Sequence, residues 1–205
     1  MTKLKRIMVT VAVAAGVLAL ATAPQAAAAP KEGPGTAVTS IKGVKLIPAQ
    51  PRGAAKRTNG VNAQADAYLI QSVLSGRCLD ADLNTINTNG TRVQLWDCDV
   101  YAAQQAFYIT AIPEGYLRFQ NVASGRYLDA DLASINTNNT RIQLWDFVGG
   151  ATNQWWLDTV IPEGYLRLQS PASGRYLTTE GSVGGNGTRV QLWDYLPGAH
   201  SQWWN

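Results

Sequence analysis

Acidic, amide and aromatic residues recur in one order three times along this chain of 205 residues. Each time, a Leu is followed by an acid or a Thr, then by Gln-Leu-Trp, and later by a Gln with an aromatic residue two positions on. Carboxylates accept hydrogen bonds, amides accept and donate them, and an indole presents a flat apolar face. Together these groups suit a ligand with a fan of hydroxyls and one apolar face, as a sugar ring has.

The elements that must position these residues belong to one unit that occurs three times. Arg-x-Gln-Leu-Trp-Asp spans residues 92–97, 141–146 and 189–194, at spacings of 49 and 48 residues. A Ser-Gly-Arg block precedes it at 75–82, 124–131 and 173–180. Because a unit of this size cannot bury its apolar face alone, the three copies must pack against one another.

Each unit is predicted to form short β-strands. In the second unit these are residues 116–120, 126–129, 141–145 and 154–161,. Alternation places Ile142 and Leu144 on one face of the third strand and Trp145 on the other. Pro-Glu-Gly at 113–115 and 162–164 predicts tight turns between units. Four strands in each of three units predict an all-β domain of about twelve strands and about 138 residues,.

Three units of 48–49 residues, each with a Gln-x-aromatic signature, resemble the β-trefoil of ricin B-type lectins over about residues 68–205. A β-propeller would need about four or more units. The resemblance implies that Phe107, Trp156 and Trp204 belong to the shared core. Trp155 and Trp203, in the middle of the signature, are expected to face outward or to lie on an edge.

The resemblance also implies a carbohydrate site in each competent repeat, numbered here as sites 1 to 3. Repeat 2 holds the full set: Asp129, Gln143, Trp145, Asn153 and Gln154. Repeat 1 holds Asp80, Gln94, Trp96 and Gln105, with Gln104 where the family prefers Asn. Repeat 3 has Thr178 in place of the acid and Ser201 in place of the amide. We therefore expect site 2 to be the strongest and site 3 the weakest, and both acids to be surface groups.

Other interpretations compete with a sugar site. One alternative is that Asp80 and Asp129 are turn acids, which accept hydrogen bonds from nearby backbone amides. Residues 80–84 lack the downstream Gly and Glu of a calcium loop. The single His, His200, has no acid or Cys partner, and three similar sites favour repeated binding over a pair of catalytic carboxylates. The sequence predicts a lectin without catalysis, cofactor or metal, with a protein-binding or protease-inhibiting β-trefoil as the alternative.

Cys78 and Cys98 are the only two cysteines, and their positions resemble the intra-repeat disulfide of this family. Two cysteines in one repeat of a secreted chain favour that bond. The corresponding pairs in the other copies are Tyr127/Phe147 and Tyr176/Tyr195. Aromatic packing is expected to replace the disulfide there.

The first 66 residues differ in character from the repeats. Residues 1–28 combine a basic head, an apolar run and small residues, as a signal peptide does, so we expect a secreted, extracellular protein with no transmembrane segment in the mature chain,. Residues 29–66 carry scattered Pro and Gly and a net charge of +4 from six basic and two acidic residues, which is typical of a flexible linker or pro-segment,. Residues 67–205 hold eight Arg and twelve acidic residues, a net charge of −4, which argues against nucleic acid as a partner,.

Asn and Arg residues also recur at equivalent places. Asn89, Asn138 and Asn186 each stand in an Asn-x-Thr pattern just before the third strand of a repeat. There a turn is the preferred interpretation over glycosylation. The recurring Arg residues are attributed to turns and strand edges rather than to anion sites.

Overall fold

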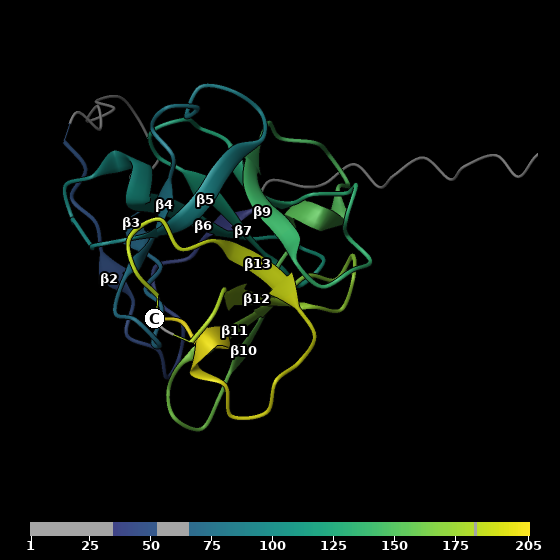
Figure 1. The fold of residues 1–205 in the computed structure, drawn as a ribbon. Coiled ribbons are helices and arrows are strands. Elements are labelled where there is room, and N and C mark those ends of the chain that lie inside the picture. Colours follow the sequence, from purple (N-terminus) through teal and green to yellow (C-terminus); the bar gives the residue numbers. More distant parts are fainter. Residues whose placement is uncertain (1–34, 53–65, 183) are drawn as a thin grey trace, which may run out of the picture.

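The computed structural model describes residues 35–52, 66–182 and 184–205, which form thirteen short strands and three single-turn 3-10 helices (Figure 1). Two strands precede the repeats, β1 (Thr36–Ala37) and β2 (Ile47–Pro48). Repeat 1 contains β3 (Ala67–Leu69), β4 (Cys78–Ala81), β5 (Thr91–Trp96), η1 (Ala103–Gln105) and β6 (Ala106–Ala111). Repeat 2 contains β7 (Leu117–Asn121), β8 (Tyr127–Ala130), β9 (Thr140–Trp145), η2 (Thr152–Gln154) and β10 (Leu157–Val160). Repeat 3 contains β11 (Leu166–Gln169), β12 (Tyr176–Thr179), β13 (Val190–Trp193) and η3 (His200–Gln202).

The first and fourth strands of the repeats follow one another around a barrel. β3 pairs with β6, β6 with β7, and β10 with β11, all antiparallel. Isolated bridges join Leu117 to Trp156, and Trp204 to both Leu166 and Ser72, which completes the ring. The second and third strands form the hairpins β4–β5, β8–β9 and β12–β13. These hairpins meet through β5, β9 and β13. The β-trefoil expected from the sequence is confirmed.

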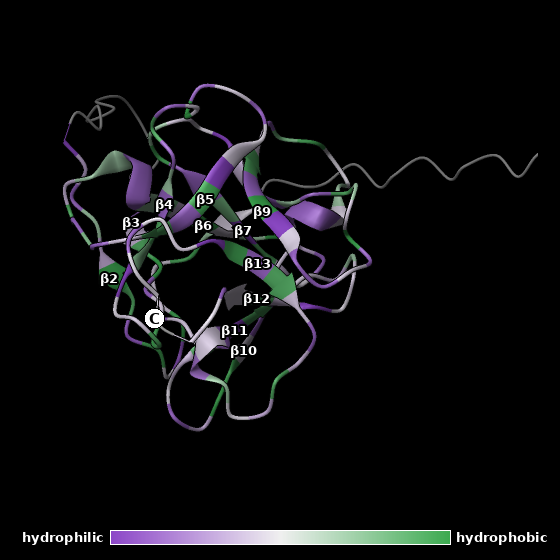
Figure 2. Ribbon diagram, viewed as in Figure 1, coloured by the Kyte–Doolittle hydropathy of each residue, from purple (hydrophilic) through white to green (hydrophobic). Residues whose placement is uncertain are grey.

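Alternation along the third strands builds the core. Hydrophilic and hydrophobic residues alternate along β5 and β9 (Figure 2). Ile142 and Leu144 are fully buried and Trp145 is partly exposed, as predicted. The turns at Pro-Glu-Gly also form, and Gly115 has a φ of 85°, a value that glycine adopts without a steric penalty,. The hairpins and the barrel therefore share one apolar core.

The number of strands differs from the expected twelve. Residues 67–193 supply eleven strands, and the fourth strand of repeat 3 is represented only by the bridges at Trp204. The strand predicted from residue 154 begins instead at Leu157, because Gln154 lies in the 3-10 turn η2. That turn aims the Gln154 side chain at the centre of the repeat.

The aromatic residues of the Gln-x-aromatic signature are all buried. Phe107, Trp156 and Trp204 are fully buried, as expected, and the indole nitrogens of Trp156 and Trp204 donate to the carbonyls of Leu128 and Leu177. Trp155 and Trp203 lie outside the apolar core cluster, as expected, but they are not exposed. Trp155 and Trp203 are only 8% and 7% exposed. Their side chains point away from the core. The rings of Tyr116 and Tyr165 stack on them, with centroid distances of 5.4 and 5.8 Å, and cover them.

Residues 35–52, called the N-terminal strap below, belong to the segment expected to be a flexible linker or pro-segment, but they lie along the trefoil and pack against it. β1 pairs with the end of β6, and β2 pairs with β3 (Figure 1). Four apolar strap residues pack against the core cluster, namely Val38, Ile41, Val44 and Leu46. The predicted signal peptide and the remaining linker residues, 29–34 and 53–65, lie outside the described residues.

A contact that we call the inter-repeat clasp joins each repeat to the next. The Asn89 side chain donates to Asp146 Oδ2 (2.9 Å) and accepts from the Asp146 backbone N–H (2.8 Å). Arg126 Nε lies 3.1 Å from both Asn89 Oδ1 and Asp146 Oδ1. Equivalent contacts join Asn138 to Arg175 and Asp194, and Asn186 to Arg77 and Asp97. The recurring Asn and the Arg of each Ser-Gly-Arg block therefore have a structural role.

The predicted disulfide is present. Cys78 and Cys98 are bonded, with a Cα–Cα distance of 5.1 Å, across the end of the β4–β5 hairpin. Aromatic pairs take its place in the other repeats, with centroid distances of 5.4 Å for both Tyr127–Phe147 and Tyr176–Tyr195. Among the described residues, no helix has the length and apolar character needed to cross a membrane.

Candidate functional site

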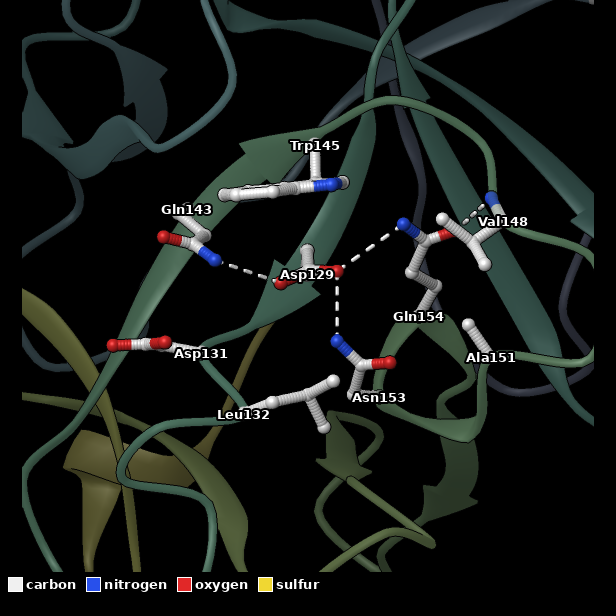
Figure 3. Close-up of a pocket in the computed structure, with 9 residues that line it drawn as sticks. All are labelled: Asp129, Asp131, Leu132, Gln143, Trp145, Val148, Ala151, Asn153 and Gln154. Atoms are coloured by element: carbon white, nitrogen blue, oxygen red, sulfur yellow. Dashed lines mark hydrogen bonds between the residues drawn. The ribbon is translucent and has the colours of Figure 1, made fainter.

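The carboxylate of Asp129 is the centre of site 2 (Figure 3). It lies on β8 opposite Gln143 on β9, so the two side chains share one face of the hairpin. Gln143 Nε2 donates to Asp129 Oδ1 (3.0 Å), while Asn153 Nδ2 (2.8 Å) and Gln154 Nε2 (3.1 Å) both donate to Oδ2. Asp129 as a whole is only 3% exposed. A carboxylate has about four acceptor positions, so three amides leave it about one for a ligand.

The expectation that the acids are surface groups is therefore wrong. Asp80 and Asp129 are both buried, because the amides of the Gln-Leu-Trp strand and of the 3-10 turn close around them. Burial raises the pKa of Asp129 to about 6, and the hydrogen bonds from Gln143 and Gln154 offset part of that rise. Burial also raises the pKa of Asp80, with an opposing effect of the amides of Gln105 and Gln94.

A cavity of about 180 Å³ opens beside Asp129. Its lining residues come from β8, β9 and the segments that follow each of them. They are Asp129, Asp131, Leu132, Gln143, Trp145, Val148, Ala151, Asn153 and Gln154. The Trp145 ring is 37% exposed and lies over the carboxylate (Figure 3). All five residues predicted for site 2 are thus brought together. A flat apolar face and a buried acceptor meet in one depression.

The Gln of the signature is a scaffold for the wall of the cavity. Gln154 Nε2 donates to the Asp146 carbonyl as well as to Asp129, and Gln154 Oε1 accepts from the N–H of Val148. Gln154 itself is almost fully buried. It therefore holds the acid and the segment after Trp145 in a fixed relation, and only its edge reaches the cavity.

Site 1 repeats this arrangement with one weaker contact. Gln94 Nε2 lies 3.3 Å from Asp80 Oδ1, and Gln105 Nε2 donates to Asp80 Oδ2 (3.1 Å) and to the Asp97 carbonyl (3.0 Å). Gln104 replaces Asn153, and its amide lowers the pKa of Asp80, as the amides of Gln105 and Gln94 do, against the larger opposing effect of burial. Trp96 is exposed on the same hairpin. The residues predicted for site 1 also lie together.

Site 3 lacks a carboxylate at its centre. Thr178 Oγ1 donates to the carbonyl of Tyr176 and accepts from Gln202 Nε2 (3.1 Å). A cavity remains, lined by Thr178, Gln191, Trp193, Leu196 and Ser201 among others. The scaffold persists, but the strongest hydrogen-bond acceptor of sites 1 and 2 is missing.

The turn-acid alternative is wrong for Asp80 and Asp129, whose partners are side-chain amides. It describes their neighbours instead: Asp82 accepts from the N–H of Asn84 (3.0 Å) and Asp131 from that of Ala133 (3.1 Å). The sequence interpretation also missed Leu132 and Val148 as lining residues. Leu132 is 64% exposed at the mouth of the cavity. Its recurrence as Leu83 in repeat 1 and its absence from repeat 3 were the available signal.

Comparisons with known proteins agree with this architecture. A designed threefold-symmetric protein, ThreeFoil, has 24% identity and a TM-score of 0.63, over 68% of this chain and 96% of that one. An exo-β-1,3-galactanase from Clostridium thermocellum has 25% identity and a TM-score of 0.62, over 68% of this chain and 29% of the enzyme. The C-half of an earthworm R-type lectin, in complex with GalNAc, has 18% identity and a TM-score of 0.51, over 67% and 94%.

These structural likenesses show the fold. A search of curated proteins gave no match. The family model of the ricin-type beta-trefoil lectin domain-like proteins matches residues 57–145 and 103–193, which together span more than half of the chain. With three repeats, their shared signature and the trefoil topology in agreement, the chain belongs to the ricin-type beta-trefoil lectin domain-like family.

Proposed function

We propose that this protein is a secreted carbohydrate-binding protein that binds glycans or polysaccharide through sites 1 and 2. One observation carries the proposal: in repeat 2 a buried carboxylate, an amide and an exposed indole face meet in one cavity of about 180 Å³. The carboxylate accepts a sugar hydroxyl, and the ring of Trp145 covers the apolar face of the sugar. The GalNAc complex of the earthworm lectin supports galactose-configured sugars as the first ligands to test.

Binding rather than catalysis is the proposed activity. Both acids are enclosed by the same kind of amide scaffold. The second carboxylate that lines the cavity of site 2, Asp131, accepts the N–H of Ala133 in its own turn, a structural role rather than that of a paired catalytic acid,. In the galactanase this trefoil corresponds to less than a third of the enzyme. A binding module of this kind serves to hold a sugar polymer, and the absence of product from a glycan-hydrolysis assay would agree with that.

Each site is expected to be weak. A few hydrogen bonds contribute about 1–3 kcal/mol each, a ring contact adds about 1 kcal/mol, and association costs must be subtracted. About −4 kcal/mol remains, which corresponds to a millimolar dissociation constant for a monosaccharide. Two sites on one rigid body then gain affinity for a polymer through effective concentration.

A glycan array on the full chain, followed by calorimetry, tests the proposal. Asp129→Asn should remove binding at site 2 and Asp80→Asn at site 1, because each leaves the volume of the side chain but replaces one acceptor oxygen by a donor. Thr178→Ala in repeat 3 is the matched control and should change little. If the folded double Asp variant binds the polymer as tightly as the parent, the sites are wrongly assigned and a protein-binding function becomes the better proposal.

A further inference from the structure

Repeat 1 departs from the other two repeats at three positions beside the N-terminal strap. It has Ala67, Leu69 and Ala106 where the others have Tyr, Arg and Trp. The carbonyl of Ala67 accepts from the N–H of Ala49 (2.8 Å), and Leu69 pairs with Ile47 of the strap. The small and aliphatic side chains therefore leave room for a second layer of chain where the other repeats carry a Tyr–Trp stack.

The end of the strap contacts residues 97–102, called the site-1 loop below. The N–H of Gln50 donates to the carbonyl of Val100 (2.6 Å), and that of Arg52 donates to the carbonyl of Tyr101 (3.2 Å). The Arg52 guanidinium also lies 5.1 Å from the centre of the Tyr101 ring, a distance at which a cation is attracted to an aromatic face.

In the other repeats the segment after the third strand also has a cation over one of its rings, and that cation comes from the first strand of the same repeat. There the pairs are Arg118 over Phe147 at 5.0 Å and Arg167 over Tyr195 at 4.9 Å. Repeat 1 has Leu69 at the position of those Arg residues. It also has Cys98 where the other repeats have Phe147 and Tyr195. Its cation–ring contact is therefore a different one, between Arg52 of the strap and Tyr101 of the site-1 loop.

The site-1 loop is connected directly to the acid of site 1. The N–H of Asp99 donates to Gln105 Oε1 (2.8 Å), and Gln105 Nε2 donates to Asp80 Oδ2. In repeat 2 the corresponding segment supplies two residues of the cavity wall, Val148 and Ala151. A shift of the site-1 loop would therefore move both a wall of site 1 and the amide that orients Asp80.

We propose that the strap is a positioning element for site 1, acting through Gln50 and Arg52 on the site-1 loop. Site 1 then depends on an intact strap for its affinity, and site 2 does not. The inference rests on the proposed carbohydrate function, and it assigns the two sites different requirements although their acid and ring residues are alike. It also predicts that a trefoil fragment beginning after residue 52 has only site 2 at full strength.

The test measures each site alone in the full-length chain. Asp129→Asn leaves site 1 and Asp80→Asn leaves site 2, and N-acetylgalactosamine is the probe in NMR titrations. Into each background we would introduce Arg52→Ala together with Gln50→Pro, which removes the guanidinium and the N–H that bonds Val100. Lys45→Ala, an exposed strap cation, is the control for loss of charge.

The strap double variant is expected to weaken site 1 by about fivefold or more and site 2 by less than about twofold, with Lys45→Ala changing neither. Equal weakening of both sites, or none at site 1, would overturn the proposal. If neither site binds the probe, the proposed function fails for this sugar, and amide hydrogen exchange still decides the strap inference. The Asp99 N–H should exchange faster in the strap variant while the Val148 N–H does not, and unchanged exchange at Asp99 would refute it.

Discussion

Asp129 should make this protein less stable as the pH rises from about 4 to about 6. Its pKa is raised by burial from an ordinary 3.8 to about 6, so between these values the folded state holds a proton that the unfolded state has released. The free energy of unfolding therefore falls with pH across this window. A difference of about two pKa units corresponds to about 3 kcal/mol, an order-of-magnitude figure. The raised pKa of Asp80 acts in the same direction.

The measurement is urea unfolding at several pH values, followed by tryptophan fluorescence, for the parent and for Asp129→Asn. Other carboxylates titrate in this range, so the informative quantity is the difference in unfolding free energy between the two proteins. It should change in favour of the variant by up to about 3 kcal/mol between about pH 4 and about pH 7. Glu163→Gln, at an exposed turn, is the control for the removal of a surface carboxylate. A constant difference for Asp129→Asn would show that Asp129 titrates normally.

Four further predictions follow from contacts described above. Sugar binding at site 2 should weaken below about pH 6 as Asp129 gains a proton, which calorimetry in the Asp80→Asn background would detect. Thiol titration of the denatured, unreduced protein should find no free thiol, and replacing Cys78 and Cys98 by Ser should cost about 3 kcal/mol for a loop of 20 residues, measured by urea unfolding,. Removal of residues 202–205 should cost several kcal/mol because it deletes the buried Trp204, and an unchanged melting temperature would contradict its place in the core,. Asn138→Ala should lower stability by about 1–3 kcal/mol by opening one clasp, whereas the same change at Asn84, whose amide bonds only within its own turn, should cost less in calorimetric melting,.

The threefold repeat in the sequence predicted most of the fold. Three copies of a unit that cannot fold alone restrict the architecture, and alternation correctly assigned Ile142 and Leu144 to the core,. The N-terminal strap could not be found in this way, because strands of two residues are held by backbone bonds and have no periodic pattern. The sequence indicated it only indirectly, because repeat 1 has Ala67 and Ala106 where the other repeats have Tyr and Trp.

The residues of the site were predicted from the sequence, but their burial was not. The resemblance to ricin B-type lectins identified Asp129, Gln143 and Gln154 as members of one site. The burial of the acid, however, depends on three amides that converge from β9 and η2. Trp155 illustrates the same limit: its place in the signature correctly put it outside the apolar core cluster, but Tyr116 stacks on it and it is buried. Which outward residues are covered is a property of tertiary packing, and local sequence patterns do not contain it.

The inter-repeat clasp runs in one direction: repeat 1 gives its Asn to repeat 2, repeat 2 to repeat 3, and repeat 3 to repeat 1. Each repeat thus has a giving surface and a receiving surface, and the chain closes on itself like a head-to-tail ring of three subunits. Unlike a linear array of repeats, such a ring has no terminal unit from which unfolding can spread. Loss of any one clasp opens this ring and so also destabilises the packing of the other two repeats. The three sites should therefore be lost together in a single cooperative transition.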